Sequence, residues 1–138
     1  MGTIISMIVE LYCLPDYVLS PNWHGSWRFK ARVAKELRLT SSREARFVKP
    51  EGWRPLESAV IKITYIVPDR RRRDGDNWLA MAKPAIDGLC VPREPWKDKN
   101  DKWYAEVGAG ILKDDDKVRY EPVEFVVDKA RAPRMIIE

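Results

Sequence analysis

Two aspartates separated by one residue, Asp74 and Asp76, are well suited to bind a metal ion. They follow an apolar run typical of a β-strand, and if the chain stays extended beyond it, side chains two residues apart point to one face. Two carboxylates held together repel each other unless a cation lies between them. Oxygen ligands of this kind select hard ions, so the pair predicts a site for Mg²⁺ or, as a second option, Mn²⁺.

Two further charged groups could complete such a site. One carboxylate of an acidic triplet at 114–116, placed at the end of a neighbouring strand, would supply a third ligand. A bound metal can lower the pKa of its water, polarise a phosphoryl oxygen and offset developing charge. Four arginines directly precede the aspartate pair and could hold a phosphate backbone against the metal: Arg70, Arg71, Arg72 and Arg73.

Each of these groups also has an ordinary structural interpretation. Aspartate pairs are common in loops and at helix N-termini, and Asp76 or Asn77 could cap the helix predicted to follow. An arginine run can be a solvated surface or a general nucleic-acid patch, and an acidic triplet is usually a turn. Taken alone, therefore, none of the three groups establishes metal chemistry.

Together, the three groups resemble the RusA family of Holliday junction resolvases. The resemblance rests on PDRRRRDGDN (68–77), KPAIDGL (83–89) and GILKDDDKV (110–118), and it covers the chain from about Ile61 to Val118. RusA proteins are small, homodimeric, Mg²⁺-dependent endonucleases associated with phages and prophages. The resemblance implies a homodimer that cuts four-way DNA junctions in the cytoplasm of a bacterium or of a phage-infected host cell.

Carried over by position, the resemblance implies roles for four residues. Asp74, Asp76 and Asp115 become the catalytic, metal-binding carboxylates, with Asp114 as a neighbour of the third. The family also uses a lysine after the second aspartate, and Lys83 is the best match.

The spacing of Lys83 departs from the best-known members, which place the lysine four residues after the second aspartate, where this chain has Ala80. Lys83 lies seven residues after Asp76. Offsets of four and seven return to nearly the same face of a helix, so Lys83 could reach the site from one turn further along. The structural alternative is an i,i+4 ion pair with Asp87.

The elements that must position these residues follow from hydropathy patterns. Strands are predicted at 4–12, 59–67 and 123–127, and helices at 26–39 and about 77–89, the second with Pro84 inside it as a kink or a new start. Residues Thr40 to Ser42 are expected to interrupt the first helix, whose apolar face includes Phe29, Val33 and Leu37. This order predicts a single α/β domain over residues 1–138, with a mixed sheet and helices packed on it.

Residues 90–109 are predicted to form an insertion loop, longer than the link in compact RusA members. Three aromatic residues in it alternate with basic ones: Trp96, Trp103 and Tyr104 with Arg93, Lys97, Lys99 and Lys102. Such a pattern suits contact with unstacked bases. Dimer contacts and simple packing are equally open at this point.

Composition and charge narrow the class of protein. The 138 residues are 45% hydrophobic and 33% charged, which excludes collagen-like, coiled-coil and disordered chains. Residues 1–73 hold 14 basic and 7 acidic side chains, whereas residues 74–138 hold 11 and 14, so a basic half meets an acid-rich half. This distribution suits a protein that attracts a polyanion and performs metal chemistry on it.

Several classes of site and location are disfavoured. Two cysteines are too few for a disulfide framework, and the lone His24 has no zinc-ligand spacing around it. No signal peptide or membrane span is expected, so we predict an intracellular, reducing compartment. Two alternatives to a junction resolvase stay open: a non-enzymatic basic DNA-binding protein, and a metal-dependent nuclease acting on other branched DNA.

Overall fold

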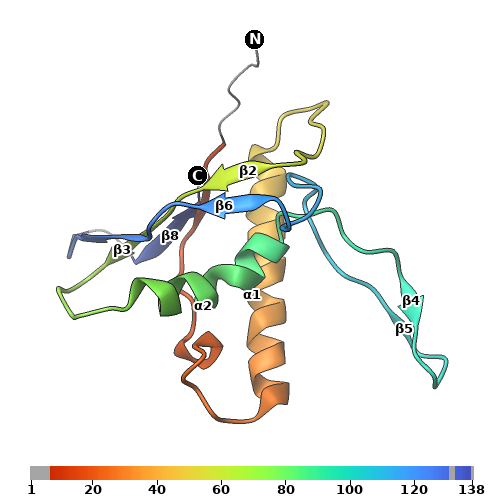
Figure 1. Cartoon of the computed structure of the whole chain (residues 1–138), viewed down its shortest axis with the longest axis horizontal. Helices are drawn as coiled ribbons and strands as arrows, with labels where there is room; N and C mark the ends of the chain where they lie inside the picture. The colour runs from red at the N-terminus through yellow and green to blue at the C-terminus, as the bar shows by residue number, and fades with distance from the viewer. Residues whose placement is uncertain (1–6, 131–132, 138) are drawn as a thin grey trace.

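The predicted α/β fold with mixed β-structure and two packed helices is confirmed in a computed structural model, which describes residues 7–130 and 133–137 (Figure 1). The core sheet has the order β1-β8-β3-β7 and is formed by Val9–Leu11, Arg134–Ile137, Ile63–Val67 and Glu124–Val127, respectively. β8 runs antiparallel to both β1 and β3, while β3 and β7 are parallel. Of the strand predicted at 4–12, residues 9–11 form β1, and residues 4–6 lie outside the described residues.

The apolar run at 59–67 was expected to form one strand and instead forms two. Ala59–Ile61 (β2) pairs in parallel with Val118–Tyr120 (β6) as a separate ribbon, and β3 begins only after Lys62. Ile61 pairs with Tyr120 but Thr64 pairs with Glu124, so the facing segment between β6 and β7 is one residue longer than the segment between Ile61 and Thr64. Pro122 lies in that segment and has no N–H to offer a ladder. The 59–67 run is therefore divided because the segment that faces it is divided into β6 and β7. The residues of the run itself do not indicate this division.

Strand β3 lies between β8 and β7, and all five of its residues are buried. Ile61, Ile63, Tyr65 and Val67, which alternate along the chain, are all core residues. Ile66, whose side chain points to the opposite face of the strand, is also buried. A central strand covered on both faces loses the alternation of a half-exposed strand.

Helix α1 runs from Trp27 to Val48, so the interruption predicted at Thr40 to Ser42 is wrong. Ser41 and Ser42 are buried where α1 packs against helix α2 (Gly75–Asp87), and the Ser41 hydroxyl donates to the carbonyl of Ala85 at 2.7 Å. A Cβ on Gly88, just after α2, would lie 2.5 Å from the carbonyl oxygen of Arg38. The serines are therefore small residues at a close helix contact.

Two other expectations for the first helix and the C-terminal region have mixed outcomes. Leu37 belongs to the core as predicted, whereas Phe29 is exposed and packs beside Trp23 in the loop before α1. The strand predicted at 123–127 is confirmed as β7, but β6 and β8 were not predicted. Among the described residues, no helix combines the length and apolar character needed to cross a membrane.

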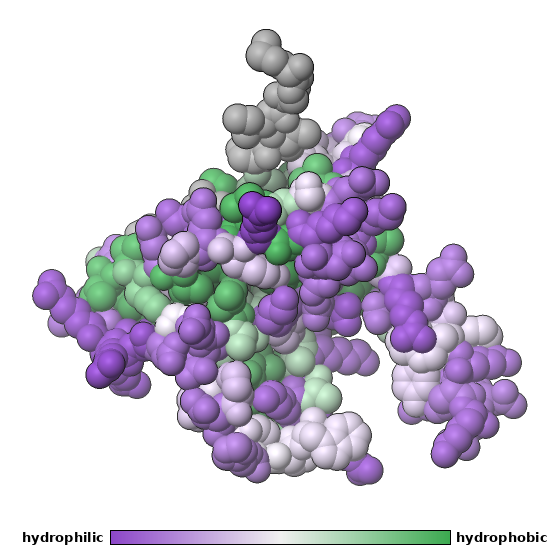
Figure 2. Space-filling model, viewed as in Figure 1, coloured by the Kyte–Doolittle hydropathy of each residue, from purple (hydrophilic) through white to green (hydrophobic). Residues whose placement is uncertain are grey.

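The segment predicted as an insertion loop contains a two-stranded hairpin, formed by Trp96–Lys97 (β4) and Trp103–Tyr104 (β5). It projects from the body beside α1 (Figure 1). In the space-filling view the hairpin is mainly hydrophilic to neutral, while hydrophobic surface gathers over the sheet (Figure 2). The hairpin therefore adds little to the core.

Candidate active site

The aspartate pair lies at the start of α2, with both side chains exposed. Asp74 is the N-cap, and its Oδ1 accepts hydrogen bonds from the backbone N–H of Asp76 at 2.9 Å and of Asn77 at 3.4 Å. Asp76 lies in the first turn, so the extended arrangement predicted for the pair is replaced by a helix start. The helix cap suggested at Asp76 or Asn77 lies two or three residues earlier, because Asp74 is the N-cap residue.

Lys83 and Asp115 are brought together by the fold. The Lys83 Nζ lies 3.6 Å from Asp115 Oδ2, and these side chains are 44% and 35% exposed. Lys83 also donates a hydrogen bond of 3.2 Å to the hydroxyl of Tyr120 on β6, and its ammonium lies 5.0 Å from the centre of that ring. Two separated segments of the sequence resemblance thus meet at one point.

The sequence gives no motif that identifies Tyr120 as part of this cluster. It lies four residues beyond the acidic triplet, in a strand that was not predicted. Its place becomes evident only from the pairing of β6 with β2, which sets Tyr120 beside Ile61. The alternation of Val118 and Tyr120 was the one signal that could have indicated a strand with Tyr120 on a defined face.

Asp76 and Lys83 share one face of α2. The residues at offsets of four, seven and eleven from Asp76 are Ala80, Lys83 and Asp87, which lie along a single stripe at about 100° per residue. Pro84 lies within α2, and the helix continues through it to Asp87. At about 1.5 Å rise per residue, Lys83 lies roughly 10 Å along the axis from Asp76.

Electrostatics keep this lysine charged. Burial lowers the pKa of Lys83, but the hydrogen bond to Tyr120 and the charges of Asp115 and Asp87 outweigh burial, so the pKa is raised above its ordinary value. Burial raises the pKa of Asp87, against the opposing effect of Arg38 and with a further increase from Asp115. Lys83 is therefore an ammonium ion at neutral pH.

The donor chemistry at the start of α2 fits a hard cation. Asp74 and Asp76 are oxygen ligands, and Mg²⁺ is commonly held by one or two carboxylates together with water and substrate phosphates. Within residues 7–130 and 133–137, no three His, Cys, Asp or Glu side chains come close enough to hold a metal ion. The structure therefore brings Asp115 to Lys83 and does not gather it into one group with the aspartate pair.

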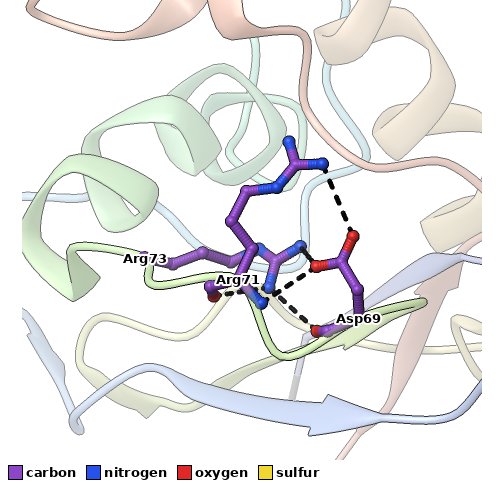
Figure 3. Close-up of polar contacts among 3 residues, drawn as sticks. All are labelled: Asp69, Arg71 and Arg73. Carbon is purple, nitrogen blue, oxygen red and sulfur yellow. Dashed lines mark hydrogen bonds and ion pairs between the residues drawn. The ribbon is translucent and has the colours of Figure 1, made fainter.

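The four arginines before the pair differ in their surroundings. The side chain of Arg73 is only 9% exposed, and its guanidinium pairs with Asp69 at 2.8 Å (Figure 3). The guanidinium also lies 5.7 and 6.0 Å from the centres of the Trp78 and Phe125 rings. The same guanidinium donates to the carbonyls of Asp69 and Arg71. Arg73 thus holds the loop onto the sheet, a role that was not predicted.

Asp69 is the anion that organises this loop. It also lies 3.6 Å from the guanidinium of Arg71, which is otherwise exposed (Figure 3). The hydrogen bond from Arg73, followed by the backbone N–H of Arg71, lowers the pKa of Asp69. Arg70, Arg71 and Arg72 are the members of the run that face solvent.

Comparison of the chain with protein-family models and with curated protein sequences finds no match.

Proposed function

We propose that this protein is a Mg²⁺-dependent, structure-specific DNA endonuclease of the RusA type, which resolves four-way junctions by phosphodiester hydrolysis. The observation that supports this most strongly is the contact of Lys83 with Asp115. It joins KPAIDGL to GILKDDDKV on the helix that Asp74 caps, so three motifs of the resemblance converge on α2. A homodimer would present two such sites to a two-fold symmetric junction.

In this proposal, different residues bind the metal, stabilise charge and contact the DNA backbone. Asp74 and Asp76 would hold Mg²⁺, which when bound supplies a Lewis acid and a more acidic water. The Lys83 ammonium would stabilise negative charge that develops on the scissile phosphate. Asp115 and Tyr120 hold this ammonium in place. The exposed arginines Arg70, Arg71 and Arg72 would contact neighbouring phosphates.

A second candidate function is a non-enzymatic DNA-binding protein. It is favoured by the structural work that two acids already do, because Asp74 caps α2 and Asp69 pairs with two arginines. In such a protein the carboxylates would need no metal. A nuclease for other branched DNA would use the same residues as a junction resolvase.

Cleavage of a labelled four-way junction and of a matched duplex, each with Mg²⁺ or EDTA, separates these functions. We expect paired nicks on the junction alone, and only with Mg²⁺. Binding without nicks across several divalent metals would favour the DNA-binding protein. Equal cutting of a flap or duplex would retain the metal site and contradict junction specificity.

A further inference from the structure

The hairpin arm, residues 93–104, carries aromatic side chains that the core does not use. Trp103 is 62% exposed although it lies in a strand, and Tyr104 next to it is also exposed. The arm extends away from the sheet and from α2 (Figure 1). Packing of the domain therefore does not explain why these large rings are there.

A cation lies over each ring of the arm. The guanidinium of Arg93 is 3.8 Å from the centre of the Trp96 ring, and the ammonium of Lys97 is 5.0 Å from that of Trp103. Lys102 lies over Tyr104 at 5.5 Å. The hairpin register sets this arrangement, since it pairs Lys97 with Trp103 and Trp96 with Tyr104, whose rings stack 5.7 Å apart.

The acidic side chains that shape the arm are engaged in its own fold. Asp98 accepts hydrogen bonds from the N–H of Asn100 and Lys102 and from the hydroxyl of Tyr104. Glu106, at the base, accepts from the N–H of Arg93 and pairs with Arg38 of α1 at 3.4 Å. These contacts hold the arm in shape before any ligand arrives. Its exposed charged side chains are Arg93, Lys97, Lys99 and Lys102 together with the acids Glu94 and Asp101, so cations are in excess.

A groove of about 400 Å³ separates the arm from α1, within the size range of ligand clefts. Lys35 and Arg38 line it on the α1 side, and Trp96 and Tyr104 line it on the arm. Asp87 also lines the groove, one turn along α2 from Lys83. The groove thus joins two rings of the arm to the C-terminal part of α2, the helix that also carries Lys83.

We propose that the hairpin arm binds an unpaired DNA strand, stacking bases on Trp103 and Tyr104 while Lys97, Lys102 and Lys35 contact its phosphates. Every base has a π-face, so such binding has little sequence preference and favours unpaired over paired DNA. Trp and Tyr are also enriched in protein–protein interfaces, whereas lysine is depleted there, so the lysines beside the rings are the feature that favours a polyanion over a second subunit. The inference rests on the proposed function for DNA as the substrate and extends it to unpaired bases at the strand-exchange point.

Fluorescence anisotropy with a labelled oligothymidylate of about 15 nucleotides, and with a duplex of the same length, tests the arm in EDTA. Trp103→Ala should bind the single strand about tenfold more weakly and the duplex as wild type does, and Trp103→Phe should retain most of the affinity. Trp27→Ala is the matched control, because Trp27 is also largely exposed and lies 5.6 Å from Arg28. The control should bind both probes normally.

Unchanged single-strand affinity in Trp103→Ala would overturn the proposal. So would a dimer that becomes a monomer on that substitution in sedimentation, because the arm would then belong to a subunit interface. Junction cleavage by wild type separates this failure from failure of the proposed function. If wild type nicks junctions and Trp103→Ala binds normally, only the arm is refuted. If wild type never nicks and Trp103→Ala still weakens single-strand binding, the arm stands and the nuclease is refuted.

Discussion

At the scale of single residues, the central feature is a lysine whose position is set by two partners from a distant segment. Asp115 and Tyr120 both contact the Lys83 ammonium, and they lie 32 and 37 residues further along the chain. A charged group fixed in this way is preorganised to meet negative charge on a phosphate. The tyrosine positions the lysine and need not touch the substrate.

We therefore expect Lys83→Met to slow junction cleavage by about a hundredfold or more, because it removes the charge that would stabilise the transition state. Tyr120→Phe should slow it only a few-fold, since the ammonium and Asp115 remain. Single-turnover cleavage with saturating enzyme measures both effects. Lys113→Met is the control, because Lys113 is exposed and pairs with Glu57. Cleavage by Lys83→Met at the wild-type rate would contradict the assignment.

The lowered pKa of Asp69 leads us to expect that the stability of the fold depends on pH. Its pKa is lowered in the folded protein, so the stabilisation it provides is present above its unfolded pKa of about 3.9 and is lost as the pH falls through the folded value. Asp69→Asn should accordingly unfold at lower urea concentration than wild type near neutral pH. The gap in midpoint should close at acid pH. A gap that stays constant through the acid range would show that the carboxylate charge is not responsible.

At the scale of elements, helix α2 explains why one aspartate could serve two roles. The same carboxylate that caps the helix is a proposed metal ligand, and capping uses Oδ1. The positive end of the helix dipole also favours anionic side chains in this turn. Substitutions at Asp74 can separate the two roles.

Asp74→Asn should keep the cap and lose the metal ligand, because an asparagine side chain also accepts hydrogen bonds from N–H groups. Its urea unfolding should match wild type, whereas its junction cleavage should be abolished. Asp74→Ala should lose both and cost about 1 kcal/mol of stability. Wild-type cleavage by Asp74→Asn would mean that Asp74 is only a cap.

Elements set by local sequence patterns were predicted correctly, whereas elements set by long-range contacts were not. The second helix was predicted because its pattern is local, and its continuation through Pro84 preserves the face that joins Asp76 to Lys83. The end of α1 was predicted too early, because serines such as Ser41 usually disfavour the interior of a helix. Here the Ser41 hydroxyl donates a hydrogen bond to the carbonyl of Ala85, a contact that the local sequence does not indicate. Strand β8 was missed because it is short, and its pairing with β1 and β3 is a long-range property that no window of sequence contains.

Some residues of the candidate site could likewise be predicted from the sequence, and others could not. The sequence resemblance assigned the acidic pair, Lys83 and Asp115 to one site, and the structure places the lysine and the third acid in contact, a pairing that was not predicted. The use of Arg73 inside the loop was not predictable from a run of four equivalent arginines. Its burial beside the rings of Trp78 and Phe125, which come from a helix and a distant strand, distinguishes it from its neighbours.

At the scale of the whole molecule, the hairpin arm and the helix that carries the proposed nuclease centre line one groove, through Trp96 and Tyr104 on the arm and Asp87 on α2. Lys83 lies on the face of the helix toward β6, and Asp87 faces the groove that leads to Trp96 and Tyr104. A junction contains both paired arms and a point where strands separate. We therefore expect a bound junction to place its scissile phosphate near Lys83 and its unpaired bases on the arm.

Single-turnover cleavage of a four-way junction by Asp76→Asn tests the central claim most directly, with Asp116→Asn as a control that makes the same charge change in the acidic triplet. We predict that Asp76→Asn loses cleavage by at least about a hundredfold with Mg²⁺ while its junction affinity is retained, because losing a negative charge does not weaken attraction to phosphate. Asp116→Asn should cut normally. Cleavage by Asp76→Asn at the wild-type rate would contradict a metal-dependent active site at the start of α2.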